Sequence, residues 1–253
     1  MTVPDSVLCK IIRADEHLQS FAADITEYFE QHPAKVVRQN EGSPDEYIAK
    51  VIVDKPIPVR LPLILGDYLQ NLRSSLDYLV WELVLAAKNT PTKDNMFPIC
   101  STRDRFDQAI TRRRLDGVPK PAQAVIECLQ PYNCGDFEKS LLWIADDFCN
   151  INKHRRILLT RLHSGAAPEG TKTRVIDGKN WTYTDLAAVA SNTKIGPFPI
   201  IGGTVKMPMN LHIISFIAFD EGAAKGVEIT TVMRGMRDYI RASVLPLFNE
   251  FFI

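Results

Sequence analysis

The sequence lacks net charge, because its 253 residues carry thirty Lys and Arg side chains and thirty Asp and Glu side chains. A protein that coats nucleic acid usually carries an excess of basic residues. The balance therefore excludes a chain that is basic throughout, and it confines any nucleic-acid contact to a local patch. The densest basic run is Arg112-Arg113-Arg114, which is typical of a solvated helix end and is also compatible with a phosphate or RNA contact.

The sequence also lacks any apolar run near the roughly 20 residues that span a bilayer, so we expect no membrane contact. Its first residues, MTVPDSVLCKII, contain Asp5 and no long apolar stretch, so they do not resemble a secretory signal. The five cysteines are scattered and form no CxxC pair. We therefore expect buried thiols in a reducing compartment, that is, a cytoplasmic protein.

The common motifs of cofactor and nucleophile chemistry are absent as well. GxGxxG, GxxxxGK(S/T), GxSxG and HExxH do not occur. The five histidines do not fall at the spacings of paired metal ligands. We therefore expect no metal ion and no organic cofactor.

What the sequence does contain is helical periodicity, because apolar residues recur at spacings of three and four in several segments. The long helices predicted from this pattern span about residues 5–31, 63–88, 138–155 and 228–252. Pro33 ends the first pattern, and Pro246 is expected to bend or restart the last one. Shorter helices are predicted over residues 101–114 and over PAQAVIECLQ.

β-Branched segments lie between these helices, at about residues 35–54 and 157–220. KVVRQN and EYIAKVIVDK flank a turn-rich EGSPD, which predicts a hairpin. TRVI and KNWTYT flank Asp177-Gly178, a dipeptide favoured in type I′ hairpin turns. We therefore predict a single α+β domain over residues 1–253, with a four-helix bundle-like core and inserted β-hairpins that form a small antiparallel sheet.

Four short segments occur in an order that resembles one protein family. They are LQNLRSSLDYL at residues 69–79, FPI at 97–99, QPY at 130–132 and NINKHR at 150–155. The family consists of uncharacterised bacterial proteins with segments similar to LHNLRSALDHL, FPI, QPY and NIDKHR. This chain departs from that pattern at Gln70, Tyr78 and Asn152, where the family has His, His and Asp. The resemblance implies a bacterial protein and marks positions, but it implies no activity.

Polar residues gather on two of the predicted helices. They are Asn71, Arg73, Asp77 and Tyr78 on the second helix, and Asn152, Lys153, His154 and Arg155 at the end of the third. Arg73 and Asp77 are four residues apart, which fits a surface ion pair or one wall of a cleft. The basic end of the third helix fits stabilisation of the helix dipole, or a site in which His154 acts.

We predict that these two groups form the walls of a polar cleft in an intracellular binding or regulatory protein. Arg73 and His154 should lie on facing helices, because both flank apolar stripes that share one core. Arg and Lys side chains in the walls favour an anionic ligand such as a nucleotide, a phosphate or RNA. The sequence leaves open whether the protein forms a homodimer.

An alternative follows from a weaker resemblance to the HEPN ribonucleases, which are helical bundles of toxins and defence systems. Their signature is Arg, four to six residues, then His, and here Arg73 is followed at that spacing by Tyr78. A phenol titrates near pH 10, so it is a poor general base at neutral pH. The nuclease hypothesis therefore needs His154 as the imidazole that acts with Arg73. A third hypothesis treats the whole cluster as a buried polar network that only stabilises the bundle.

Overall fold

The computed structural model describes the backbone of residues 3–32, 35–39, 46–52, 55–166, 173–174, 180–181, 189–190, 194–201, 204–205 and 212–252, and the side chains of 3–32, 55–161 and 216–252. The chain forms two compact units. The first unit comprises Met1–Ala23, Val59–Leu158 and Glu221–Ile253. The second comprises Asp24–Pro58 and Leu159–Asp220. The single-domain prediction stays a prediction.

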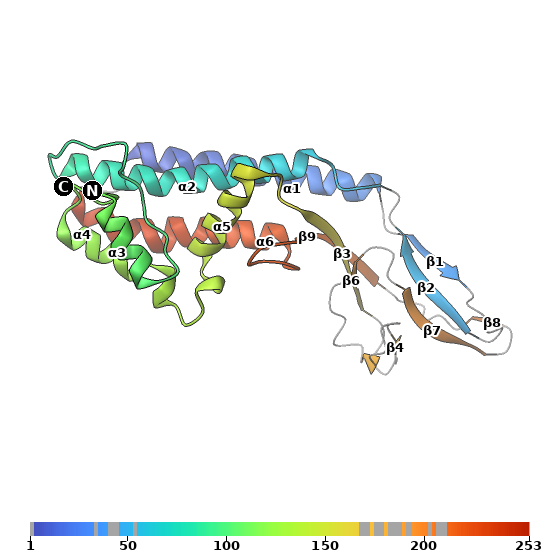
Figure 1. Cartoon of the computed structure of the whole chain (residues 1–253). Coiled ribbons are helices and arrows are strands. Elements are labelled where there is room, and N and C mark those ends of the chain that lie inside the picture. Colours follow the sequence, from blue (N-terminus) through green and yellow to red (C-terminus); the bar gives the residue numbers. More distant parts are fainter. Residues whose placement is uncertain are drawn as a thin grey trace. The chain divides into compact units, whose positions relative to one another are not determined.

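The predicted α+β class with a helical core is confirmed (Figure 1). The helices are α1 (Asp5–Gln31), α2 (Arg60–Ala86), α3 (Arg103–Thr111), α4 (Lys120–Cys128), α5 (Leu141–His154) and α6 (Ile229–Asp238). All of them belong to the first unit, except that α1 continues into the second. The long helices α1, α2 and α5 begin and end within a few residues of the predicted boundaries.

The periodic apolar stripe of α2 fills the core of the first unit. Leu65, Leu69 and Leu72 are fully buried there, as are Phe148 on α5 and Met236 on α6. Burying each large apolar side chain contributes about 1.5–3 kcal/mol. The stripe that predicted the helix is therefore also the surface that holds the bundle together.

Polar contacts fix the relative direction of α1 and α2. Ser6 donates a hydrogen bond to Glu82 at 2.6 Å, and Arg60 donates one to Ser20 at 3.4 Å. The start of α1 thus meets the end of α2, and the two helices run antiparallel. Such antiparallel neighbours are the usual arrangement in a helical bundle.

The last predicted helix is helical throughout but changes its winding. After α6 the chain continues as a π-helix over Tyr239–Val244 and as a 3₁₀-helix over Leu245–Phe251. Pro246 has no N–H group and its ring clashes with the preceding turn, so an α-helical ladder cannot pass through it. The prediction that Pro246 restarts the last turns is therefore confirmed.

The described strands belong to the second unit and pair antiparallel. One sheet has the order β1 (Lys35–Gln39), β2 (Glu46–Ile52), β7 (Lys194–Ile201) and β8 (Thr204–Val205). Another has the order β6 (Val189–Ala190), β3 (Leu159–Ala166) and β9 (His212–Phe219). β4 (Thr173–Arg174) pairs with β5 (Asn180–Trp181). Both predicted hairpins are present, and the Asp177-Gly178 turn lies outside the described residues.

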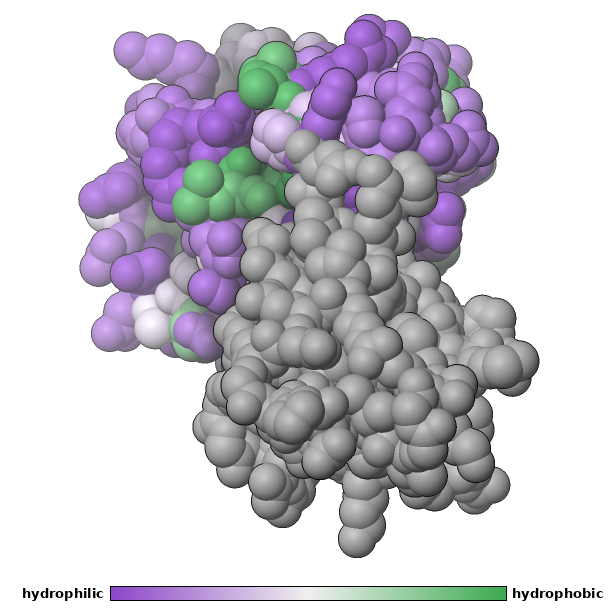
Figure 2. All heavy atoms as spheres, turned by 90° about the vertical axis from the view of Figure 1, so that its right-hand side faces the viewer, coloured by the Kyte–Doolittle hydropathy of each residue, from purple (hydrophilic) through white to green (hydrophobic). Residues whose placement is uncertain are grey.

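The described surface is mainly hydrophilic on the face seen in Figure 2, with small groups of hydrophobic side chains. On α2, for example, Leu63, Trp81 and Leu85 are exposed. Trp81 and Leu85 are four residues apart and therefore lie on one face of the helix, and apolar groups as small as this are normal on protein surfaces. Among the helices in the described part of the chain, none is both long enough and apolar enough to cross a bilayer.

Candidate functional site

A pocket of about 510 Å³ lies in the first unit beside Arg73. Its wall is formed by α2, α3, α5 and the segment Met96–Cys100. The charged residues that line it are the cations Arg73, Arg105, Arg112, Arg114 and Lys153 and the carboxylates Asp77 and Asp146. Pockets of about 300–1,000 Å³ are the usual size of small-molecule sites.

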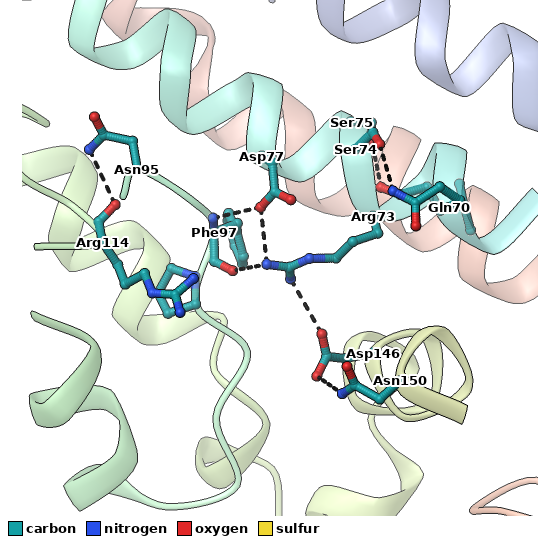
Figure 3. Close-up of polar contacts among 12 residues, drawn as sticks. Gln70, Arg73, Ser74, Ser75, Asp77, Asn95, Phe97, Arg114, Asp146 and Asn150 are labelled. Carbon is teal, nitrogen blue, oxygen red and sulfur yellow. Dashed lines mark hydrogen bonds and ion pairs between the residues drawn. The ribbon is translucent and has the colours of Figure 1, made fainter. Parts of the chain in front are cut away.

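Arg73 is the centre of a polar network at this pocket (Figure 3). Its Nη2 donates to Oδ1 of Asp77 at 3.0 Å and to the carbonyl oxygen of Phe97 at 2.6 Å. Its Nη1 lies 3.6 Å from Oδ1 of Asp146 on α5. The Arg73 side chain is only 11% exposed, and within the described residues its Nη1 has no hydrogen-bond partner. The guanidinium is therefore paired with two carboxylates and still retains an unused donor.

Asp77 completes this network by accepting a hydrogen bond from the backbone N–H of Phe97 at 2.9 Å. Arg73 and Asp77 together thus bind both backbone polar groups of Phe97. Burial raises the pKa of Asp77, and the nearby Arg73 guanidinium and the Phe97 N–H oppose that rise. The ionised carboxylate therefore depends on Arg73 for its stability.

Gln130 holds the next residues of the same wall. Its side chain is fully buried, and its Oε1 accepts a hydrogen bond from the N–H of Cys100 at 3.0 Å. Its Nε2 donates to the carbonyl oxygens of Pro98 and Ile126, both at 2.9 Å. Since Ile126 belongs to α4, this amide fastens the pocket wall to that helix.

The four segments that carry the family resemblance gather around this pocket. Arg73 belongs to the first segment, Phe97 to the second, Gln130 to the third and Lys153 to the fourth. Arg73 and Gln130 hold the second segment through its backbone, and Lys153 lines the pocket itself. Sequence reasoning missed Gln130, although its segment had been singled out.

Three of the lining arginines come from α3 and the turn that follows it. Within the described part of the chain, the guanidinium groups of Arg105, Arg112 and Arg114 form no ion pair. Their neighbours Arg103 and Arg113 lie outside the pocket lining and pair with Asp107 and Asp116, respectively. Arginines without an ion-pair partner in the described residues are thus concentrated on the pocket side of α3, and the charge of Arg114 acts on Asp77 of the same pocket by opposing the rise that burial causes in the pKa of that carboxyl.

The backbone at the end of α3 explains how alternate arginines reach the pocket. The N–H of Arg113 donates to the carbonyl of Ile110 at 2.9 Å. The N–H of Arg114 donates to the carbonyl of Ala109 at 3.1 Å, which completes a Schellman motif. Arg113 occupies its left-handed position with φ 63°, where glycine is usual. The chain reverses there, so Arg112 and Arg114 line the pocket and Arg113 does not.

The other residues predicted on α2 lie outside the pocket lining. Asn71 donates its amide to the carbonyl of Asp67, one turn earlier, at 2.8 Å. Tyr78 is 43% exposed, and the Nζ of Lys10 lies 5.1 Å from its ring centroid. Of the residues predicted on this helix, Arg73 and Asp77 line the pocket.

The residues predicted at the end of α5 separate in the same way. Lys153 lines the pocket and donates to Asn150 at 3.1 Å. Arg155 instead binds both carboxylate oxygens of Glu221, and this pairing lowers the pKa of Glu221. His154 is exposed, although its helix packs on α2. It lies about 12 Å along the helix axis from Asp146, the residue of α5 that contacts Arg73. It is not part of the pocket lining.

Asn152, the remaining predicted residue, packs against Gly66 of α2. A Cβ atom at Gly66 would lie 2.6 Å from both Nδ2 and Oδ1 of Asn152. We expect Gly66→Ala to destabilise the protein, because overpacking costs about 1–3 kcal/mol and alanine gains only about 1 kcal/mol in helix propensity. In combination with Asn152→Ala the clash is gone, and the alanine should then stabilise.

Urea denaturation of the wild type, the two single variants and the double variant measures this coupling. Additive effects would show that the two side chains do not constrain each other.

The cysteines differ from the prediction of buried thiols. Cys100 and Cys149 are buried, whereas Cys9, Cys128 and Cys134 are exposed. Burial raises the pKa of Cys100, which lines the pocket, and raises that of Cys149 to about 12. Both buried thiols therefore stay protonated at neutral pH. Among the described residues, no three His, Cys, Asp or Glu side chains are grouped so that they could hold a metal ion.

The pocket thus offers positive charge and hydrogen-bond donors. No histidine is among its lining residues, and Cys100 is a protonated thiol. Comparison of the chain with models of protein families, with curated proteins and with solved structures found no match.

Proposed function

We propose that the pocket beside Arg73 binds an anionic, phosphate-bearing ligand and that the protein acts by binding rather than by catalysis. The observation that carries the proposal is the presence of three arginines without an ion-pair partner in the described residues, at a pocket of about 510 Å³. A guanidinium matches phosphate oxygens in a bidentate fork. Like charges held close together repel one another, so an anion bound among them would relieve that repulsion.

The other two hypotheses explain less of this arrangement. The nuclease hypothesis needs His154 near Arg73, and His154 is not part of the pocket lining. The structural hypothesis accounts well for Arg73, which pairs with both Asp77 and Asp146. It gives no reason for the three arginines that lack an ion-pair partner among the described residues. The free thiols of the chain also agree with the reducing compartment, the cytoplasm, that we propose for the protein.

We expect pyrophosphate to raise the melting temperature of the wild type at low ionic strength. A ligand at 100 times its Kd stabilises a folded protein by about 2.7 kcal/mol. Arg112→Ala and Arg114→Ala should lose most of this response, because both side chains line the pocket. Thermal melts with and without pyrophosphate measure the effect.

Arg113→Ala is the matched control, because Arg113 lies between these two residues and outside the pocket lining. It should keep the full response to pyrophosphate. An equal loss in all three variants would point to general surface charge, and no response in the wild type would contradict the proposal. RNA cleavage that is lost in His154→Ala would support the nuclease hypothesis instead.

A further inference from the structure

The pocket has two ends that differ in charge. On one side, α3 and the turn after it carry Arg105, Arg112 and Arg114, which form no ion pair within the described residues. At the other end, two cations are balanced by two carboxylates, namely Arg73, Lys153, Asp77 and Asp146. Figure 3 shows Arg114 and Gln70 on opposite sides of the Arg73 guanidinium. A ligand that fits both ends carries its negative charge at one end only.

The balanced end and the wall between the ends suit an uncharged organic group. The side chains of Gln70 and Asn150 line the pocket there. The Asn150 amide is held by Asp146 and Lys153, whereas the Gln70 amide donates to Ser74 at 3.3 Å and keeps its oxygen and a second N–H for a ligand. Pro98 and Ile99 add apolar surface. Since pockets of about 300–1,000 Å³ accommodate whole small molecules, this one has room for more than a single tetrahedral anion.

We infer that the ligand is a small phosphomonoester, and this inference rests on the proposed anion-binding function. Its phosphate would bind Arg105, Arg112 and Arg114, and its organic body would lie against Gln70 and Ile99. A phosphomonoester carries about −1.5 to −2 charge at pH 7 and three strong acceptor oxygens. Three guanidinium groups carry more than enough positive charge to neutralise that phosphate, and they provide one guanidinium for each of its three acceptor oxygens.

The surroundings of the pocket favour a small molecule over an RNA chain. RNA binding requires cationic surface that follows a backbone over several nucleotides. Beside the pocket, Arg103 pairs with Asp107 and Glu127, and Arg113 pairs with Asp116. The two arginines that flank the lining are therefore neutralised by carboxylates and do not continue its cationic surface.

Calorimetric titration of the full chain with five probes tests the inference: inorganic phosphate, ribose 5-phosphate, AMP, adenosine and an oligouridylate without terminal phosphate. At least one phosphomonoester should bind roughly tenfold tighter than phosphate, the equivalent of one or two hydrogen bonds. Adenosine and the oligonucleotide should bind more weakly than that phosphomonoester. Its affinity should rise with pH through about 6, where the phosphate becomes a dianion.

The outcomes separate the inference from the proposed function. Phosphomonoesters that bind no tighter than phosphate would overturn the inference and leave anion binding in place. Tighter binding of the oligonucleotide would also overturn it, in favour of RNA. If no anion binds, the inference and the proposed function both fail.

Two variants locate the ends of the ligand. Gln70→Ala should weaken the tightest phosphomonoester roughly fivefold and leave phosphate binding unchanged, because one hydrogen bond contributes about 1 kcal/mol. Arg112→Ala should weaken both ligands, and Arg113→Ala should weaken neither. Equal losses of both ligands in Gln70→Ala, or no loss of either, would overturn the assignment of the organic body to that end.

Discussion

Arg73→Ala is expected to lower the free energy of unfolding by about 3 kcal/mol at pH 7. The substitution leaves Asp77 and Asp146 without their shared cation, and removing one partner of a buried pair costs about 3–5 kcal/mol. The lower end of that range applies because the two carboxylate side chains are 29% and 21% exposed. Urea denaturation of the wild type and the variant measures the loss.

The pH dependence of this loss identifies its cause. Burial already raises the pKa of Asp77, and Arg73 opposes that rise, so the variant should hold this pKa higher still. An acid with a raised folded pKa destabilises the protein when it is ionised and stops doing so as pH falls and the group takes up a proton. The difference between wild type and Arg73→Ala should therefore shrink between pH 7 and about pH 4.

Arg73→Lys is the control, because it keeps the positive charge without the guanidinium fork. Its free energy of unfolding should fall less than that of Arg73→Ala. If Arg73→Ala is as stable as the wild type but no longer responds to pyrophosphate, Arg73 serves the ligand alone. In that case the network with Asp77 would contribute little to folding.

The helices were predictable because periodicity is a local property of the chain. Leu65, Leu69 and Leu72 are spaced as one helical face in the sequence, and the same residues are buried in the structure. Pro246 is visible in the sequence, and it explains why the chain continues as a 3₁₀-helix from Leu245. Which strand pairs with which was not predictable, because β2 and β7 are separated by most of the chain.

The site was predictable only in part, because helical spacing says which residues share a face and not what that face meets. Arg73 and Asp77 were identified from their spacing, and they do form a pair. The arginine run after α3 was recognised as basic, but the left-handed backbone at Arg113 separates its members. Such a conformation is rare for residues other than glycine, so an arginine at this position does not predict it. Arg105 lines the pocket only through the tertiary packing of α3.

Gln130→Leu is expected to cost about 3 kcal/mol, although Gln130 lies outside the pocket lining. It would leave the buried N–H of Cys100 and the carbonyl of Pro98 without the partners they have in the wild type. Each buried polar group without a partner costs about 1–3 kcal/mol. The response to pyrophosphate should weaken too, because the pocket wall loses its fastening to α4. Urea denaturation and thermal melts with pyrophosphate measure the two effects.

Gln130→Glu separates the loss of hydrogen bonds from a change in shape, because the two side chains are nearly the same size. The introduced carboxylate can still accept from Cys100, but its other oxygen would face the carbonyls of Pro98 and Ile126, where the wild type has an amide donor. Its folded pKa should therefore lie above the ordinary value of about 4.3. For an acid with a raised folded pKa, stability is lowest when the group is ionised, so this variant should recover as pH falls from 7 to 5. Gln130→Leu introduces no titrating group. Its stability should therefore change between pH 7 and pH 5 only as much as that of the wild type does. Equal losses in both variants at both pH values would show that the Gln130 amide does not hold this wall through its two donors.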